Sequence, residues 1–233
     1  MHEVLRPWWP PRVADLVIQP DDEPIYDDQD GGRTNYYNWY RWVAGLVRPR
    51  VVLEIGVRLG YSAWALALEG GTQTFIGLDN ECYISGSNQR AREFLQWRYS
   101  QVLLHTVDTR SITTLRPYLS NQLPDVIHID GDHALVHCRH DLELAHEVLP
   151  VGGTLLVDDA SLDKEPGQAC QEFLRDHCGD YGYLIFSEEL TFRGHHLLIR
   201  LKPATETGDC RARRTEVDLR PVYPRVEMEC QSK

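Results

Sequence analysis

The segment VVLEIGVRLGYS, residues 51–62, decides how this chain folds. Five largely apolar residues, as in a strand buried on both faces, lead into a turn with glycines at positions 56 and 60 and then into a helix. Glycine lets backbone come close to a ligand, and open α/β sheets bind ligands at the carboxyl ends of their strands. The segment therefore predicts the first strand–turn–helix unit of a ligand-binding α/β sheet.

The rest of the chain keeps alternating between short apolar runs and helical stretches. We expect strands at 51–55, 74–79, 101–106, 125–130 and 153–158, and helices at 61–68, 88–98, 112–119 and 134–148. Such alternation predicts a parallel sheet in the order 3-2-1-4-5 with helices on both faces. A helix at 168–177 and two closely connected strands at 183–187 and 195–201 predict a terminal antiparallel hairpin. The predicted fold class is α/β: a doubly wound, Rossmann-like, seven-stranded mixed sheet.

Composition changes near both ends of the chain. Residues 1–33 are rich in Pro, Asp and Gly and predict an irregular N-terminal arm. Residues 34–202 are expected to form one domain, and residues 203–233 form a C-terminal tail of mixed charge and little periodicity. Because exposed paired tryptophans are costly, Trp8 and Trp9 in the arm favour docking on a second subunit, so a homo-oligomer is expected.

The charge balance limits the classes of molecule that the protein can bind. The 233 residues carry 24 Lys and Arg against 35 Asp and Glu, a net charge of −11, which repels nucleic acid and anionic lipid. No apolar run approaches the roughly 18 residues of a membrane span, and the first residues lack the apolar stretch of a signal peptide. The six cysteines form no Cys-x-x-Cys pair and are expected to be reduced thiols. We expect a cytoplasmic protein that binds neither nucleic acid nor membrane.

Two carboxylates accompany the glycine turn. Glu54 precedes the first glycine by two positions, and Asp79 ends the second predicted strand. A carboxylate there attracts a ligand with a cationic tail, and an acidic residue placed like Asp79 accepts hydrogen bonds from ribose hydroxyls. The spacing of Gly56 and Gly60 lacks the middle glycine of the dinucleotide fingerprint. An adenosine ligand with a cationic tail is favoured, and a dinucleotide-dependent oxidoreductase is the first alternative.

These residues carry a resemblance to a known group of enzymes. The string EIGVRLGYS, from Glu54 to Ser62, followed by Asp79, is similar to the cofactor site of class I S-adenosylmethionine-dependent methyltransferases. The strings IDGDH (129–133) and DD (158–159) resemble the metal-dependent O-methyltransferases of sugar, macrolide, polyketide and aminocoumarin antibiotics and the cephalosporin-hydroxylase-like group. The resemblance spans about residues 34–201. It implies that S-adenosylmethionine is the cofactor, held by Glu54, Gly56, Gly60, Ser62 and Asp79, with Asp108 at the adenine edge unless it caps a helix.

Three aspartates form the predicted metal site. Asp130 ends the fourth predicted strand, and Asp158 and Asp159 end the fifth, its expected neighbour about 4.8 Å away. Carboxylates so close repel one another unless a cation lies between them, and an all-oxygen site suits Mg²⁺, or else Mn²⁺ or Ca²⁺. Such an ion can lower the pKa of a substrate hydroxyl and orient its oxygen. The alternative is that Asp158 or Asp159 caps a turn.

The proton acceptor is expected beside this site. His133 is favoured because histidine titrates near neutrality, and Asp132 is the competing base. His133, His137 and His140 could share one helix face, but a zinc site there is the weaker reading because no glutamate follows His133. The predicted function is a Mg²⁺-assisted O-methyltransferase for a small hydroxylated molecule. The second alternative is a non-catalytic, cofactor-binding accessory subunit.

Overall fold

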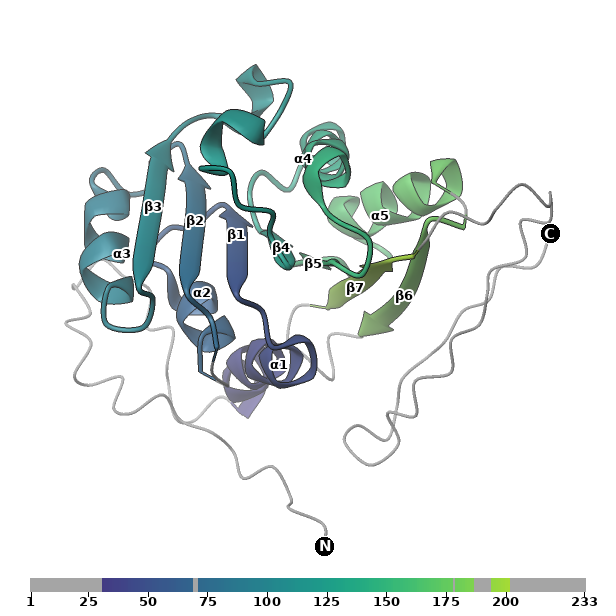
Figure 1. Cartoon of the computed structure of the whole chain (residues 1–233). Helices are drawn as coiled ribbons and strands as arrows, with labels where there is room; N and C mark the ends of the chain where they lie inside the picture. Colours follow the sequence, from purple (N-terminus) through teal and green to yellow (C-terminus); the bar gives the residue numbers. More distant parts are fainter. Residues whose placement is uncertain (1–30, 69–70, 178, 187–193, 202–233) are drawn as a thin grey trace, which may run out of the picture.

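The computed structural model describes residues 31–68, 71–177, 179–186 and 194–201 (Figure 1). Seven strands form one sheet in the order β3-β2-β1-β4-β5-β7-β6. Their bounds are β1 Val51–Ile55, β2 Thr74–Asp79, β3 Gln101–Thr106, β4 Val126–Ile129, β5 Thr154–Val157, β6 Tyr181–Phe186 and β7 His195–Arg200. Strands β1 to β5 pair in parallel, and β7 runs antiparallel to both β5 and β6. The predicted mixed, doubly wound sheet with its terminal hairpin is confirmed.

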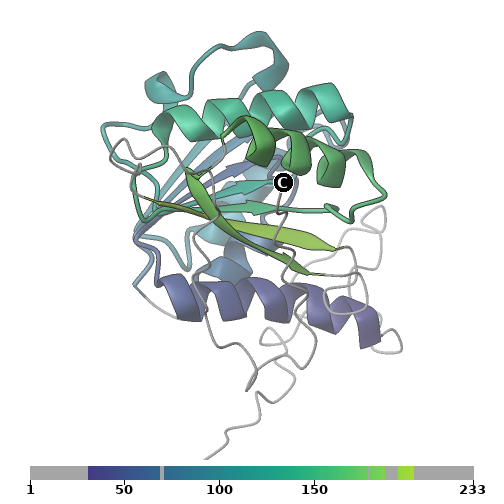
Figure 2. The same cartoon turned by 90° about the vertical axis from the view of Figure 1, so that its right-hand side faces the viewer.

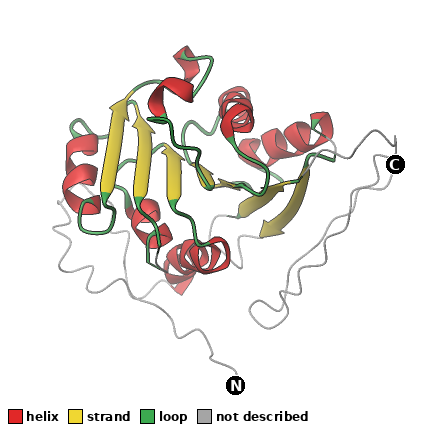
Figure 3. Ribbon diagram, viewed as in Figure 1, coloured by secondary structure: helices red, strands yellow, loops and turns green. Residues whose placement is uncertain are grey.

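Helices cover both faces of the sheet (Figures 2 and 3). On one face lie α1 (Gly31–Val47), α2 (Tyr61–Leu66) and α3 (Ser87–Leu95), packed on a core that includes Trp39, Val52 and Phe75. On the other face lie α4 (Leu135–Val148) and α5 (Glu165–Asp176), packed on a core that includes Leu53, Ile55 and Phe173. Successive residues of β1 thus enter opposite cores, because side chains alternate along a strand.

The predicted helix at 112–119 does not form. Two short 3-10 turns, η2 (Thr109–Ser111) and η3 (Arg116–Tyr118), take its place. Ile112, Thr113 and Thr114 are β-branched and disfavour a helix. Pro117, in the first turn of η3, has no amide hydrogen, so a helix through residues 112–119 would lose a hydrogen bond there. The fold around this segment is otherwise as expected.

The ends of β4 and β5 differ from prediction by one residue, and this positions the site. Strands β4 and β5 end at Ile129 and Val157, so Asp130 and Asp158 follow the strands rather than close them. The predicted N-terminal domain boundary at residue 34 falls inside α1, which begins at Gly31. Almost all of the predicted arm and the whole predicted tail lie outside the described residues. Within the described residues, no helix is long and apolar enough to cross a membrane.

Candidate functional site

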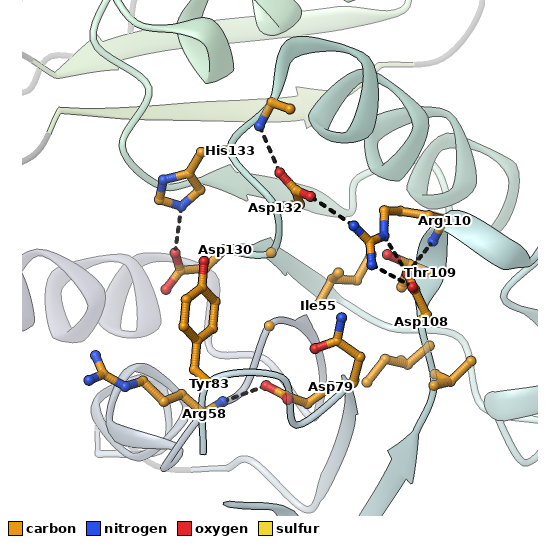
Figure 4. Close-up of a pocket in the computed structure, with 16 residues that line it drawn as sticks. Ile55, Arg58, Asp79, Tyr83, Asp108, Thr109, Arg110, Asp130, Asp132 and His133 are labelled. Carbon is orange, nitrogen blue, oxygen red and sulfur yellow. Dashed lines mark hydrogen bonds and ion pairs between the residues drawn. The ribbon is translucent and has the colours of Figure 1, made fainter. Parts of the chain in front are cut away.

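A cavity of about 490 Å³ lies at the carboxyl ends of β1 to β4 (Figure 4). Its walls are the segments that leave these strands: residues 55–56 from β1, 78–80 from β2, 107–110 from β3 and 130–134 from β4, with Arg58 and Tyr83. This is the edge at which open α/β sheets bind ligands, and the volume suits a ligand of nucleoside size.

The glycine turn passes directly under the end of β4. Gly56 has φ of 84°, and a Cβ atom on it would lie 2.0 Å from the carbonyl oxygen of Asp130. The Gly56 amide donates to the Leu78 carbonyl at 2.8 Å, which joins the turn to β2. Only glycine permits both this left-handed backbone and this close approach. Gly60 also has a positive φ, 80°, but it begins α2 against Leu95 and does not line the cavity.

Asp79 holds the turn from the neighbouring strand. Its Oδ2 accepts hydrogen bonds from the amides of Val57, at 2.9 Å, and Arg58, at 2.8 Å. Its Oδ1 accepts one from the amide of Glu81 at 2.6 Å. The carboxylate lies in the cavity wall and shapes the turn at the same time (Figure 4). Its predicted contact with a ribose stays a prediction.

Glu54 and Ser62 lie away from the cavity, contrary to the direct cofactor contact expected of them. The Glu54 side chain is completely buried on the α1 face of the sheet, where its Oε1 accepts from the Ser62 hydroxyl and lies 2.6 Å from Nδ1 of His128. The reason is the alternation of the strand: Ile55 lines the cavity, so its neighbour Glu54 turns to the other side. Strand register then places Glu54 directly beside His128 of β4.

A buried series of polar side chains continues from this pair, and it was not predicted from the sequence. The Tyr40 hydroxyl lies 2.9 Å from Nε2 of His128 and 3.3 Å from Nε2 of His195. The same nitrogen of His195 lies 2.8 Å from Oδ1 of Asp158. The available signal was a histidine inside each apolar strand run, VIHI and HHLLIR. A buried imidazole needs polar partners, so such positions mark a hydrogen-bonded core.

His133 lies between two of the three predicted metal ligands. Its Nε2 is 3.5 Å from Oδ1 of Asp130 (Figure 4), and its Nδ1 is 3.5 Å from Oδ2 of Asp159. The hydrogen bond with Asp130 raises the pKa of His133. Burial, and then the charge of Asp158, raise the pKa of Asp130 to about 7. Lys164 also approaches Asp159, with Nζ 3.4 Å from Oδ1.

The third predicted ligand, Asp158, is placed differently. Its side chain is completely buried and pairs with His195, whereas Asp130 and Asp159 are partly exposed. Within the part of the chain that the structure describes, the group of three metal-ligating side chains whose ligand atoms lie within 4.8 Å of one another is elsewhere, at His146, His177 and Asp180. The three aspartates therefore do not converge on one point as expected, because the chain turns between Asp158 and Asp159.

Asp130 and Asp159 nevertheless fit a hydrated divalent cation. Mg²⁺ is commonly bound by one or two carboxylates, with water or substrate completing its six ligands. The two carboxylates face one shared group, the His133 ring, at 3.5 Å each, and the hydrogen bond with Asp130 raises the pKa of that ring. A metal ion at this place would replace the imidazole, so the donor chemistry fits Mg²⁺ or Mn²⁺ with two protein ligands rather than three.

Asp132, the competing base, is occupied by other contacts. It accepts from the amide of Ala134 at 2.9 Å and lies 2.7 Å from Nδ1 of His137 and 3.3 Å from Nη1 of Arg110. The amide hydrogen bond and the histidine hold the pKa of Asp132 below its usual range despite partial burial. A carboxylate so stabilised in its charged form is a weaker proton acceptor than His133.

Arg110 closes one wall of the cavity and was missed from the sequence. Its guanidinium binds Asp108 at 2.6 Å and Asp132 at 3.3 Å, so it joins the segments after β3 and β4 (Figure 4). The Asp108 side chain also accepts from the Arg110 amide and caps η2. Asp108 thus caps a short turn and also lines the cavity, and its predicted contact with adenine stays a prediction.

The alternative histidine cluster does not assemble. His137 faces Asp132, and Nε2 of His140 lies 3.1 Å from the carbonyl of Thr109 and 3.0 Å from that of Ile112. His133 faces Asp130 and Asp159 instead. Each ring is directed at its own partner, so these three histidines form no zinc site.

Comparison with known proteins agrees with this fold. Residues 53–160 match a family model described as a methyltransferase domain. No curated protein matches the sequence. Among solved structures, the chain is similar to the O-methyltransferase TomG from Streptomyces achromogenes, involved in tomaymycin synthesis and solved with S-adenosylmethionine (TM-score 0.54, 16% identity, 71% of this chain and 79% of that one).

Two further structures share the fold. One is an O-methyltransferase from Bacillus cereus in complex with S-adenosylhomocysteine (TM-score 0.54, 16% identity, 70% of this chain and 80% of that one). The other is the S-adenosylhomocysteine-bound methyltransferase PaMTH1 from Podospora anserina (TM-score 0.51, 19% identity, 75% of this chain and 81% of that one). At these identities the likeness is one of fold.

Proposed function

We propose that this chain, a class I S-adenosylmethionine-dependent methyltransferase with the fold of the O-methyltransferases, methylates a hydroxyl group of a small molecule. The enzyme class and the fold are those predicted from the sequence. The hydroxyl as acceptor and the residues that serve it are the proposed part.

The observation that carries the proposal is the position of His133. It lies in the wall of the same cavity as Gly56 and Asp79, which belong to the turn after β1 and the end of β2. Bound S-adenosylmethionine supplies an electrophilic methyl group on a sulfonium. The acceptor oxygen forms the new bond to the methyl carbon as the carbon–sulfur bond breaks, and His133 takes the hydroxyl proton. The products are a methyl ether and S-adenosylhomocysteine.

The cofactor residues follow from the cavity walls. Gly56 gives the backbone room, Asp79 presents its carboxylate to the ribose, and Asp108 lies at the wall expected to contact adenine. Glu54, Gly60 and Ser62 do not line the cavity. Glu54 and Ser62 hydrogen-bond to each other on the buried side of the turn, and Gly60 begins α2. We therefore assign them to positioning the turn rather than to touching the cofactor.

Asp130 and Asp159 are the residues that would hold Mg²⁺ or Mn²⁺. A divalent ion held there would supply Lewis acidity, which lowers the pKa of a substrate hydroxyl group. The same two carboxylates lie beside His133, and the hydrogen bond with Asp130 raises the pKa of its ring. A cation bound by Asp130 and Asp159 would lower that pKa and so favour the neutral ring that accepts a proton.

The acceptor class rests on the resemblance to enzymes of sugar, polyketide and phenolic natural products. TomG, which shares the fold, is described as acting in tomaymycin synthesis. The net charge of −11 supports a small molecule rather than nucleic acid or an anionic membrane as the substrate.

Cofactor binding and transfer test the proposal separately. In calorimetry, S-adenosylhomocysteine should bind at least about tenfold more tightly than NAD, a difference of about 1.4 kcal/mol. With S-adenosylmethionine labelled in its methyl group and a panel of sugars, polyketides and phenols, the label should enter an oxygen-linked methyl group. Tighter binding of NAD, or label found only on nitrogen or carbon of accepted substrates, would contradict the proposal.

A further inference from the structure

A second group of metal-ligating side chains lies outside the cavity. His146 is in the last turn of α4, His177 follows the end of α5, and Asp180 immediately precedes β6. One ligand atom of each lies within 4.8 Å of the others. Helix α4 begins next to the cavity, and His146 is 11 residues beyond Leu135, about 16 Å along the helix axis. The group is therefore separate from the Asp130 and Asp159 site.

Each histidine has one ring nitrogen held by an outer partner. Nδ1 of His146 lies 2.8 Å from the Tyr181 hydroxyl, and Nε2 of His177 lies 3.0 Å from Oε2 of Glu143. The two rings are 4.1 Å apart between centroids. Nδ1 of His177, the nitrogen not held by Glu143, lies 3.8 Å from Oδ2 of Asp180. Metal-binding histidines characteristically present this pattern, in which one nitrogen bonds an outer carboxylate or hydroxyl and the other faces the ion.

The local backbone fixes His177 and Asp180 relative to each other. The Asp180 amide donates to the His177 carbonyl at 3.0 Å, and the Leu201 amide donates to the Asp180 carbonyl at 2.7 Å. These bonds close the turn between α5 and β6 and tie it to the end of β7. His146 joins from α4, which lies beside α5 (Figures 1 and 2). Three separate elements thus present their donors to one place.

We propose that His146, His177 and Asp180 form a zinc site with three protein ligands and one position for water. Two imidazole nitrogens and one carboxylate oxygen suit Zn²⁺, whereas Mg²⁺ prefers oxygen ligands alone. Nε2 of His146 and Nδ1 of His177 are the ligating nitrogens, since Tyr181 and Glu143 hold the others. The ion would link α4, α5 and β6 at the side of the domain away from the methyl-transfer cavity.

The electrostatic surroundings favour this use. Burial, and then the charge of His177, lower the pKa of His146, which favours the neutral ring that binds metal. The nearby cations are engaged elsewhere: Arg139 binds Glu143 at 2.5 Å and Asp176 at 2.9 Å, and Arg200 donates to the carbonyl of His146 at 2.6 Å. Glu143 therefore serves as an outer partner that is itself held by Arg139.

Cobalt spectroscopy of the metal-free full chain tests the site without an activity assay. Co²⁺ should bind one site with visible absorption bands of a four-coordinate nitrogen and oxygen environment, and Zn²⁺ should displace it even with Mg²⁺ in excess. Glu143→Gln should weaken Co²⁺ binding by about 10–100-fold. Asp180→Ala and His177→Ala should each weaken it by more than that. His105→Gln, which removes a histidine from β3 at the opposite edge of the sheet, should change nothing.

Three results would overturn the proposal. Intense near-ultraviolet bands of a cobalt–thiolate bond would place the ion on cysteine. Equal Co²⁺ affinity of wild-type and Asp180→Ala protein would place it elsewhere, as would loss of binding in Asp159→Asn alone. Because His177→Ala removes packing against Phe173, thermal unfolding with and without Zn²⁺ is measured on Asp180→Ala. Zn²⁺ should raise the unfolding temperature of the wild type and not that of this variant.

Discussion

The carboxylate of Glu54 and the imidazole of His128 form an ion pair inside the sheet, with Oε1 2.6 Å from Nδ1 and neither side chain exposed. Parallel pairing of β1 with β4 sets these two residues side by side. Burial disfavours a charged His128, but the hydrogen bond and the charge of Glu54 outweigh it and raise the pKa of His128. The glutamate of the glycine motif therefore stabilises the folded turn through a partner on the adjacent strand β4, 74 residues later in the sequence.

Removing His128 should destabilise the fold strongly. His128→Ala leaves the buried Oε1 of Glu54 with the Ser62 hydroxyl and without the imidazole. This should cost about 3–5 kcal/mol in the free energy of unfolding. Urea denaturation measures this cost. The double variant Glu54→Gln/His128→Ala should lose less than the sum of the single variants, because it leaves no buried charge. A loss below about 1 kcal/mol in His128→Ala would contradict the ion pair.

Gly56→Ala should abolish cofactor binding, because the new methyl group meets the Asp130 carbonyl at 2.0 Å. Gly152→Ala is the matched control: its φ of 85° is nearly the same, and no atom lies within 4 Å of the added Cβ. Both variants bear the left-handed strain of about 1–2 kcal/mol. Calorimetry with S-adenosylhomocysteine should show a large loss in Gly56→Ala and wild-type affinity in Gly152→Ala. Equal affinities would show that the close approach does not shape the site.

His133→Ala should lower turnover by about 100-fold or more while S-adenosylhomocysteine binds nearly as in the wild type. Asp132→Asn should have a smaller effect on turnover, because the Ala134 amide and His137 lower the pKa of Asp132 and make it the weaker proton acceptor. Steady-state kinetics and calorimetry on both variants separate the two residues. A larger loss in Asp132→Asn would make the aspartate the base.

The pH dependence should follow the His133–Asp130 pair. The hydrogen bond with Asp130 raises the pKa of His133 above the usual value of about 6.5, so in metal-free protein the ring is charged below that raised pKa and neutral above it. NMR titration of the His133 ring should give a midpoint above about 6.5 in the wild type. In Asp130→Asn the midpoint should fall. Because the hydrogen bond with Asp130 is the main cause of the raised pKa, an unchanged midpoint in the variant would contradict their contact.

Asp159 and Asp158 should differ in their response to metal. Chelation should abolish turnover, and added Mg²⁺ should restore it. Asp159→Asn removes one of the two proposed ligands and should raise the Mg²⁺ concentration needed for turnover. Asp158→Asn alters the buried contact with His195 and should lower stability while leaving the Mg²⁺ requirement unchanged. Full turnover in excess EDTA would refute the metal step and leave the base assignment to be judged by His133→Ala.

The sequence by itself determined the sheet. Local hydrophobic runs and turn residues gave β1, β2 and β3 with the predicted bounds, and alternation with helices gave their parallel order. These features depend on neighbours along the chain and on burial of both faces, so a linear pattern contains them. The helix expected at 112–119 failed for an equally local reason, Pro117 after a β-branched run.

Only the tertiary structure decided which of the motif carboxylates are buried in the core. Glu54 and Asp158 belong to the same motifs as Gly56 and Asp159, yet strand alternation and the turn after β5 send them into the buried chain of His128, Tyr40 and His195. The His146, His177 and Asp180 group likewise joins residues from α4, α5 and the start of β6. Side-chain direction depends on which strands and helices pack together, and that packing brings together residues whose spacing in sequence carries no sign of it.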